Sequence, residues 1–369
     1  MNVIFTCGGT AGHVNPALAL AGYMKERDPS VNILFVGTPA GMEKSLVEKS
    51  GYAFSGVEVS NFHRSLKELR HNLHTVRTLF TSRAEARSIL RDFRPDLVVG
   101  TGGYASYPMI RAAAAKRIPT AVHESNMIPG LTTKMLEGSA DRIMVGFEDC
   151  RRHYKDPDKI VVTGTPVRGD FFALTPAEAR AELGFTDDKP LVVSFWGSLG
   201  ASGMNQQMLD FFRAEKKEDF PFHHIHACGS KSWDAMQQQM HKEGLEHARL
   251  DVRQYIYNMA VVMRAADLVI CRAGASTISE LTALGMPAII VPSPYVVANH
   301  QEKNARILEK HGGAVVITEP ESSGEKLFTA ARDILRDPAR REAMAKGMAS
   351  LGIPDATGRI YETVMGLVK

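Results

Sequence analysis

The feature that most constrains this chain is a regular alternation of short aliphatic runs with longer amphipathic stretches. Parallel strands joined by helical crossovers produce this pattern, because strands buried on both faces lack polar alternation. We predict buried strands over residues 3–7, 31–37, 96–100, 120–123, 142–145 and 160–163. The pattern then restarts, with strands predicted over residues 191–196, 224–227, 267–271, 288–292 and 314–317. The chain is therefore predicted to be an α/β protein with two Rossmann-like domains.

A helix start separates the two series of strands. Thr175 supplies an N-cap hydroxyl, Pro176 suits the first helical position, and Glu178 completes a capping box. We predict a first domain over residues 1–167 and a second over residues 168–352. A last helix, over residues 353–369, is expected to return to the first domain.

Composition narrows the class of protein. The 369 residues are 44% hydrophobic and 23% charged, which is typical of soluble globular domains. The four cysteines, Cys7, Cys150, Cys228 and Cys271, form no C-x-x-C pair, so we expect buried free thiols rather than disulfides or structural zinc. No Lys or Arg precedes the short apolar run that reaches Gly8, so a signal peptide is not predicted and a cytoplasmic location is.

The charge is uneven along the chain. Residues 1–167 hold 21 Lys and Arg against 16 Asp and Glu, a net charge of +5, whereas the rest of the chain holds 23 against 25, a net charge of −2. This excess is too small for a dedicated nucleic-acid binder. It suits an anionic lipid surface or a phosphorylated substrate beside the first domain.

A glycine-rich loop, residues 8–13, follows the first predicted strand and precedes a helix predicted to begin near Val14. Glycines let a ligand approach the backbone, and the helix N-terminus favours a phosphate or diphosphate. The loop is neither G-x-G-x-x-G nor a Walker sequence, and an ordinary βα turn is the alternative. His13 beside it is a candidate general base, with a structural histidine as the alternative.

Two further segments follow strands of the first domain: residues 100–104, with Gly102, Gly103 and Tyr104, and residues 123–126, which end at Asn126. In doubly wound sheets, ligands bind outside the carboxyl ends of the strands. We therefore expect the three loops to line one cleft.

The second domain carries two comparable segments, residues 197–203 and 272–280. Helix starts rich in small hydroxylated residues suit a nucleotide diphosphate. Glu280 stands three residues after Thr277, so it is either a capping-box carboxylate or an acceptor for ribose hydroxyls. Residues 299–304 hold amides that match the hydroxyls of a sugar, and a polar N-cap is the alternative.

We predict no metal site. Asp156-Pro157-Asp158 has the D-x-D spacing of metal-dependent sugar transferases but stands in a Lys-flanked turn. In a strand, only His224 and His226 of the histidine cluster share a face, and no carboxylate or Cys is near in sequence.

Seven motifs occur in order along nearly the whole chain, and together they resemble the MurG family of N-acetylglucosaminyltransferases. They are Gly8-Gly9-Thr10-Ala11-Gly12-His13, Gly102-Gly103-Tyr104, His123-Glu124-x-Asn126, Pro166-Val167-Arg168, Gly197-Ser198-x-Gly200-Ala201, Arg272-x-Gly274-Ala275-x-Thr277-x-Ser279-Glu280 and Gln301-x-x-Asn304-Ala305.

The resemblance implies a GT-B fold and a reaction of peptidoglycan synthesis, and thus a part in cell shape and division. GlcNAc would pass from UDP-GlcNAc to the C4 hydroxyl of the muramoyl sugar of lipid I, with inversion, giving lipid II. No cofactor is implied. The family works at the cytoplasmic face of the cell membrane as a peripheral protein, so anionic lipid and other cell-wall enzymes are expected partners, and nucleic acid is not.

The resemblance also implies roles for individual residues. His13 and Glu280 would be the catalytic residues, and Gly102, Gly103 and Tyr104 would lie on the acceptor side. Thr10, Ala11 and Gly12 would face the diphosphates, and Ala11 stands where the family usually has glycine. Donor-binding residues would be Asn126, Arg168, Ser198, Ile256, Ala275, Ser276, Thr277, Ile278, Ser279, Glu280 and Gln301.

Two other functions remain open. UDP-GlcNAc 2-epimerases share the two-domain fold, and a non-catalytic UDP-sugar-binding scaffold would need the same donor pocket. Incubation with UDP-GlcNAc alone separates the epimerase from the transferase.

An apolar stripe at helical spacing, Leu66, Leu69, Leu73, Val76 and Phe80, runs through a basic segment. Residues 64–94 hold eight Lys and Arg against three Asp and Glu. The stripe is either core-facing or rests on anionic lipid together with Leu79, Arg77, Arg83 and Arg87.

Overall fold

The structure of the protein is a computed structural model that describes residues 1–59, 69–197, 200–218, 221–296 and 299–368. The side chains of residue 11 and of residues 69–80 are also outside the description. The chain divides into two compact units. Unit 1 comprises residues 1–167 and 353–369, and unit 2 comprises residues 168–352.

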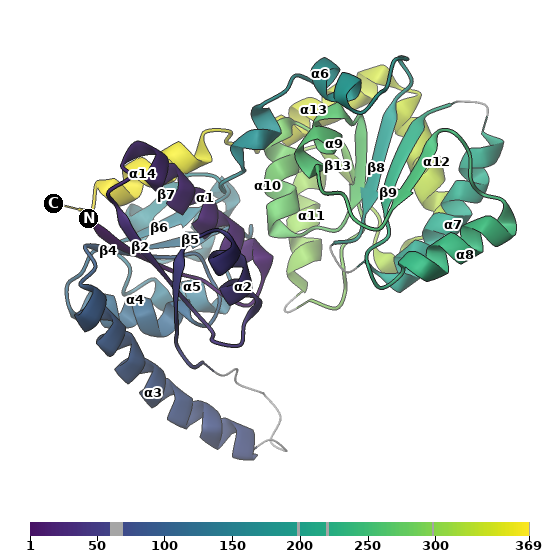
Figure 1. Cartoon of the computed structure of the whole chain (residues 1–369). Helices are drawn as coiled ribbons and strands as arrows, with labels where there is room; N and C mark the ends of the chain where they lie inside the picture. Colours follow the sequence, from purple (N-terminus) through teal and green to yellow (C-terminus); the bar gives the residue numbers. More distant parts are fainter. Residues whose placement is uncertain (60–68, 198–199, 219–220, 297–298, 369) are drawn as a thin grey trace. The chain divides into compact units, whose positions relative to one another are not determined.

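Unit 1 is built on a seven-stranded parallel sheet with the strand order β3-β2-β1-β4-β5-β6-β7 (Figure 1). Its strands are β1 (Asn2–Thr6), β2 (Asn32–Gly37), β3 (Ala53–Gly56), β4 (Leu97–Gly100), β5 (Thr120–Glu124), β6 (Arg142–Val145) and β7 (Ile160–Val162). The chain order reverses between β1 and β4, so the loops that follow these two strands are neighbours at the carboxyl edge of the sheet.

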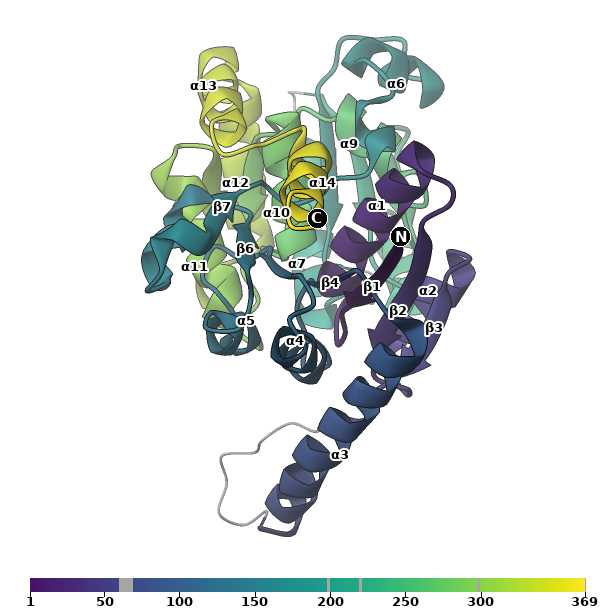
Figure 2. The same cartoon turned by 90° about the vertical axis from the view of Figure 1, so that its left-hand side faces the viewer.

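Helices cover both faces of this sheet because successive residues of each strand point to opposite sides. On β1, Val3 and Phe5 pack with α1 (Ala11–Arg27), α2 (Met42–Lys49) and α14 (Ala356–Met365). Ile4 packs with the opposite layer, which is formed by α3 (Leu69–Phe93), α4 (Ser106–Ala115) and α5 (Leu131–Leu136). Figures 1 and 2 both show α14, in yellow, lying against α1.

Unit 2 repeats the plan with a six-stranded parallel sheet of order β10-β9-β8-β11-β12-β13. Its strands are β8 (Leu191–Phe195), β9 (His223–Ala227), β10 (Leu250–Arg253), β11 (Leu268–Cys271), β12 (Ala288–Ile290) and β13 (Ala314–Val316). Its helices are α6 (Pro176–Glu182), α7 (Ser202–Lys217), α8 (Trp233–Glu243), α9 (Met259–Ala265), α10 (Ala275–Leu284), α11 (His300–Lys310), α12 (Gly324–Leu335) and α13 (Pro338–Ala349). The order reverses between β8 and β11, so the loops after these strands are neighbours.

The predicted α/β fold with two Rossmann-like sheets is confirmed. Each predicted strand is present, with ends that differ by at most two residues. The edge strands β3 and β10 were not predicted. The capping box at Thr175 is also confirmed, and the four cysteines are free and buried.

The long helix α3 extends past the end of the sheet in both views (Figures 1 and 2). Of the apolar stripe predicted for this segment, Leu66 and the side chains of Leu69, Leu73, Val76 and Phe80 lie outside the described residues. No helix in the described ranges is both long and apolar enough to cross a membrane.

Candidate active site

A cavity of about 560 Å³ opens at the carboxyl edge of the sheet in unit 2. The loops after β8, β11 and β12 and the start of α11 form its walls. Its lining residues are Phe195, Trp196, Gly197, Gly200, Ala201, Ser202, Gly203, Arg272, Gly274, Thr277, Ser293, Tyr295, Gln301 and Glu319. Residues from the three predicted segments of the second domain, 197–203, 272–280 and 299–304, therefore line one pocket.

Two helix N-termini border this pocket. Helix α7 begins at Ser202 and α10 at Ala275, and neither has an acidic residue in its first turn. Gly197 and Gly200 hold positive φ angles of 86° and 74° in the loop before α7. A Cβ at Gly200 would lie 2.0 Å from the carbonyl oxygen of Cys228, so only glycine fits there. Main-chain amides and two helix dipoles thus favour an anionic group in this pocket.

Arg272 supplies a fixed cation to the pocket wall. Its guanidinium lies 2.6 Å from the Glu319 carboxylate and donates to the carbonyl of Val291 at 3.1 Å. The guanidinium carbon also lies 5.7 Å from the centre of the Trp196 ring. Trp196, Ser293, Tyr295 and Glu319 were not predicted as site residues. In the sequence, the one indication of a site role for Trp196 and Ser293 was their position shortly after the carboxyl ends of β8 and β12.

The amide of Gln301 has a defined orientation. Its Oε1 accepts a hydrogen bond from the backbone N–H of Ser293 at 2.9 Å, so its NH₂ group is the end left to donate to a ligand. Asn299, which precedes α11, has a positive φ of 51° and its side chain does not cap the helix. It donates instead to Glu302 at 2.6 Å. The alternative of Asn299 as a side-chain N-cap is therefore excluded.

Glu280 lies on α10, one turn after Thr277. The N-cap of this helix is Gly274 and no side chain caps it, so Glu280 is not part of a capping box. Burial raises the pKa of Glu280 to about 7; Arg168 acts against this shift, and Asp170 adds to it. A carboxyl whose pKa is so raised is a candidate functional group.

The remaining predicted donor-binding residues of unit 2 differ in how exposed their side chains are. Ala275, Ser276 and Thr277 form the accessible first turn of α10, whereas the Ile278 side chain is buried. The Ser279 hydroxyl donates to the carbonyl of Ala275. The other three are Arg168, which is exposed and 3.2 Å from Asp170, Ile256, which is buried, and Ser198, which is outside the described residues.

In unit 1, the first glycine loop is shorter than predicted. Helix α1 begins at Ala11, with Thr10 as its N-cap, and not near Val14; Pro16 lies inside the helix. Pro16 is the sixth residue of this helix, and it lacks the N–H that would donate to the carbonyl of Gly12. Ala11 and Gly12 are therefore helical, and Ala11 needs no positive φ. An alanine at this position is therefore compatible with the backbone.

His13 points back onto this loop. Its Nδ1 lies 2.8 Å from the carbonyl oxygen of Gly8. A carbonyl only accepts, so Nδ1 carries the hydrogen and Nε2 keeps its lone pair. The ring also packs on the backbone of Gly102, where a Cβ would lie 2.6 Å from the imidazole. In this tautomer, Nε2 of His13 is the ring nitrogen that can accept a proton.

The loop after β4 contacts the loop after β1. Gly102 and Gly103 have φ angles of 109° and 85°, and a Cβ at Gly103 would lie 2.3 Å from the carbonyl oxygen of Gly8. The neighbouring Tyr104 side chain is exposed. These two glycine loops meet because glycine alone permits both the backbone angles and the close approach.

The loop after β5 is organised by Glu124. Its Oε1 accepts from the backbone N–H and the side-chain amide of Asn126 at 2.9 and 3.0 Å. Its Oε2 accepts from the N–H of Gly130 and the hydroxyl of Thr133, both at 2.8 Å. The predicted donor-side residue Asn126 is therefore held by a buried carboxylate of its own loop.

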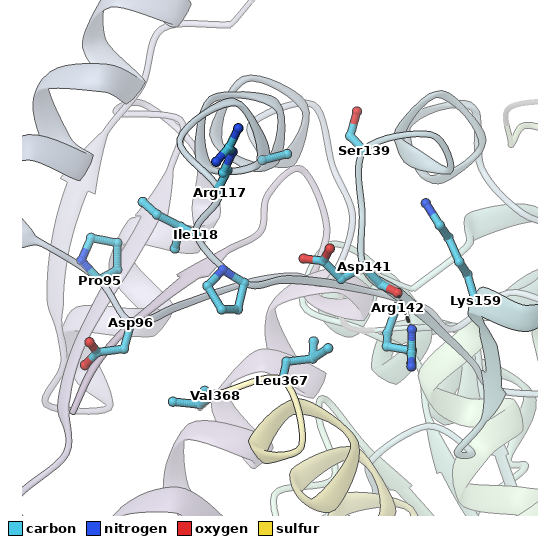
Figure 3. Close-up of a pocket in the computed structure, with 12 residues that line it drawn as sticks. Pro95, Asp96, Arg117, Ile118, Ser139, Asp141, Arg142, Lys159, Leu367 and Val368 are labelled. Atoms are coloured by element: carbon cyan, nitrogen blue, oxygen red, sulfur yellow. Dashed lines mark hydrogen bonds between the residues drawn. The ribbon is translucent and has the colours of Figure 1, made fainter.

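A larger cavity of unit 1, about 890 Å³, lies at the opposite edge of the sheet (Figure 3). Its walls include Asp96, Pro119, Asp141 and Lys159, which directly precede or begin β4 to β7. Asp96 and Asp141 accept from backbone amides of strand starts, Asn2 and Thr120, each at 2.8 Å. These carboxylates secure strand ends, and none of the predicted site residues lines this cavity.

The two motifs that were considered as metal sites in the sequence make other contacts in the structure. His224 and His226 both approach the Ser194 hydroxyl, at 2.8 and 2.7 Å, inside the core of unit 2. Asp156 accepts from the N–H of Asp158 in a short turn. Across the described ranges, no group of three or more His, Cys, Asp and Glu side chains is arranged to hold a metal ion.

Comparison with known proteins identifies the chain's family. The glycosyltransferase family 28 N-terminal domain matches residues 3–145, and the C-terminal domain of that family matches residues 191–360. A UDP-N-acetylglucosamine–N-acetylmuramyl-(pentapeptide) pyrophosphoryl-undecaprenol N-acetylglucosamine transferase of Acetivibrio thermocellus is 43% identical over all of this chain and 99% of its own length.

Solved structures agree at the level of the fold. The crystal structure of Acinetobacter baumannii MurG has a TM-score of 0.78 and 25% identity over 99% of each chain. A UDP-GlcNAc 2-epimerase from Neisseria meningitidis has a TM-score of 0.68 over 99% of this chain and 100% of its own, but at 14% identity it shares the fold alone. With both family models and full-length identity to such transferases, the chain belongs to glycosyltransferase family 28, within the MurG group.

Proposed function

We propose that this chain transfers GlcNAc from UDP-GlcNAc to the C4 hydroxyl of MurNAc in undecaprenyl-pyrophosphoryl-MurNAc-pentapeptide, with inversion at the anomeric carbon. The observation that carries the proposal is the 43% identity, over the whole chain, to a transferase named for these substrates. The pocket of unit 2 supports it, because its amides and helix N-termini suit a sugar nucleotide.

The pocket of unit 2 binds the donor. The N-termini of α7 and α10, with Arg272 and Arg168, neutralise the diphosphate, so the leaving UDP needs no metal ion. The Glu280 carboxylate accepts from the ribose hydroxyls, and the Gln301 NH₂ group donates to a GlcNAc hydroxyl. Thr277, on the accessible first turn of α10, lies beside the diphosphate.

His13 of unit 1 is the general base. Its Nε2 takes the proton of the C4 hydroxyl as that oxygen attacks the anomeric carbon from the face opposite UDP. The bond between the anomeric carbon and the diphosphate oxygen breaks, and UDP leaves. The Gly102-Gly103 loop, which contacts His13 and Gly8, shapes the acceptor side together with Tyr104.

The acceptor is a lipid, so the protein works at the cytoplasmic face of the cell membrane as a peripheral protein. Arg83 and Arg87 are exposed on α3, whereas Ala86 and Leu90 of the same helix pack into the core of unit 1. These arginines suit contact with anionic lipid. A wider assembly with other cell-wall enzymes would bring the acceptor to the same surface.

The experiment that tests the proposal follows the fate of UDP-GlcNAc with and without lipid I. A transferase releases UDP and glycosylates the lipid only when the acceptor is present. A 2-epimerase would form UDP-ManNAc from the donor alone, and a scaffold would bind UDP-GlcNAc with no turnover. The full-length identity to a transferase, against 14% to an epimerase, favours the first outcome.

A further inference from the structure

A buried carboxylate lies beneath the first glycine loop of unit 1. Glu43 is the second residue of α2, and its side chain is 0% exposed. Its Oε1 accepts from the backbone N–H of Thr38 at 2.8 Å, and its Oε2 accepts from the backbone N–H of Gly9 at 3.3 Å. Amide donors of this kind stabilise a carboxylate that has lost its water.

Three glycines make room for this carboxylate: Gly8 after β1, Gly37 at the end of β2 and Gly41 just before α2. A Cβ at Gly8 would lie 2.7 Å from Oε1 of Glu43, and one at Gly37 would lie 2.7 Å from its Cγ. A Cβ at Gly41 would collide with both carboxylate oxygens. An acid that served only the dipole of α2 would need no such space under the neighbouring loop.

Glu43 and His13 bond to the same peptide group. The N–H of Gly9 donates to Glu43, and the carbonyl of Gly8, in the same peptide unit, accepts from Nδ1 of His13 at 2.8 Å. In a trans peptide these two groups point in opposite directions. The carboxylate and the imidazole therefore hold one peptide plane from its two sides.

This arrangement has an electrostatic consequence. A carboxylate bonded to the N–H of a peptide polarises it, and its carbonyl becomes a stronger acceptor. A stronger acceptor at Nδ1–H favours the imidazolium that forms when Nε2 takes a proton. We propose that Glu43 is a positioning residue of the transfer reaction, which orients His13 and strengthens Nε2 as a proton acceptor through the Gly8–Gly9 peptide.

This inference depends on the proposed role of His13 as the base, and its test begins with Glu43→Gln. The substitution keeps the shape of the side chain but removes its charge and one acceptor. We expect kcat for transfer to lipid I to fall about 10- to 100-fold, as for partial loss of general-base catalysis. The acid limb of the pH profile of kcat should move to lower pH, since the imidazole becomes less basic.

The donor pocket lies in unit 2, so the Kd for UDP-GlcNAc should not change. Glu48→Gln is the matched control, because Glu48 is exposed on the same helix and should leave kcat unchanged. Glu43→Asp keeps the charge and should restore part of kcat, and it serves as the folded variant should Glu43→Gln be unstable.

A double-mutant cycle separates this inference from a general loss of structure. In a His13→Ala background, Glu43→Gln should change kcat by less than about three-fold, because the residue through which it acts is gone. An equal loss in both backgrounds, or an unchanged kcat and pH profile in folded Glu43→Gln, would overturn the inference. A normal kcat for His13→Ala alone would instead overturn the assignment of the base.

Discussion

Arg272 and Glu319 form an ion pair of 2.6 Å in the wall of the unit 2 pocket, with side chains only 12% and 20% exposed. The carbonyl of Val291 and the ring of Trp196 hold the same guanidinium. Because these three contacts fix the position of the guanidinium, Arg272 presents its charge to the pocket without having to reorganise when a ligand binds.

Arg272→Ala should weaken binding of UDP-GlcNAc and of UDP alike by about 1.5–3 kcal/mol, the worth of a hydrogen bond to a charged group. The variant also leaves Glu319 without its partner beside the proposed diphosphate site. The double variant Arg272→Ala/Glu319→Ala should therefore recover part of the lost affinity. Isothermal titration calorimetry measures both, and an unchanged Kd for the single variant would place the diphosphate elsewhere.

The proposed contact of Glu280 with the ribose should make donor binding depend on pH. Burial raises its pKa to about 7, so the carboxyl is largely protonated below that pH and ionised above it. Only the ionised form accepts from both ribose hydroxyls, so the affinity for UDP-GlcNAc should rise with pH by up to about tenfold per unit below pH 7 and level off above it. The diphosphate of UDP-GlcNAc is a diester and does not titrate there. Glu280→Gln should flatten the curve; the same slope in both proteins would refute this role.

Much of the fold follows from the sequence because buried parallel strands leave a strong local signal. The eleven predicted strands were recognised from short segments rich in β-branched and aliphatic residues. Strands β3 and β10 have no such run: Ala53–Gly56 ends in Ser and Gly, and Leu250–Arg253 alternates apolar and charged residues. Both are edge strands in which no residue is fully buried, so less of their surface must be apolar.

The site was predicted less completely, because some of its residues are far apart in the sequence and come together only in the folded chain. Glycine loops and helix starts are visible as local motifs, and their positions beside β1, β4, β8 and β11 follow from the doubly wound order. Glu43 lies on α2, whereas Gly8 follows β1, and Glu319 is far along the chain from Arg272. The pairing of β1 with β2, and the strand order β11-β12-β13, bring such pairs together.

Stability should fall in mildly acidic solution because of His226. Burial and the neighbouring His224 hold the pKa of His226 well below its usual value of 6.5. The unfolded chain takes up a proton near pH 6.5 and the folded protein does not, so the free energy of unfolding drops as pH falls below 6.5, by about 1.4 kcal/mol per pH unit for this residue.

Urea unfolding of wild type and His226→Gln between pH 7 and 5.5, where few carboxylates titrate, measures this effect. The slope of the free energy of unfolding against pH should be smaller in the variant by up to about 1.4 kcal/mol per pH unit, whatever the absolute stability of the variant. His241→Gln, at an exposed position, is the control and should keep the wild-type slope. Equal slopes for wild type and His226→Gln would show that His226 is charged in the folded protein.

Binding to anionic lipid should depend on α3. Each basic residue near such a surface contributes about 1 kcal/mol, so Arg83→Glu/Arg87→Glu should lower binding to phosphatidylglycerol vesicles by about 30-fold or more. Both side chains are exposed, so the fold should be preserved. Arg253→Glu, in unit 2, is a control that should bind as wild type. Unchanged co-sedimentation of the α3 variant would reject this surface.

Transfer of labelled GlcNAc to lipid I is the measurement that tests the proposed function most directly. Purified protein, UDP-GlcNAc labelled in the sugar, and lipid I in detergent should yield one labelled lipid product and one UDP per transfer. The new linkage should be β, opposite to the α linkage of the donor, and EDTA should leave the rate intact. Absence of acceptor-dependent label in the lipid, or a product with the α linkage retained, would contradict the proposal.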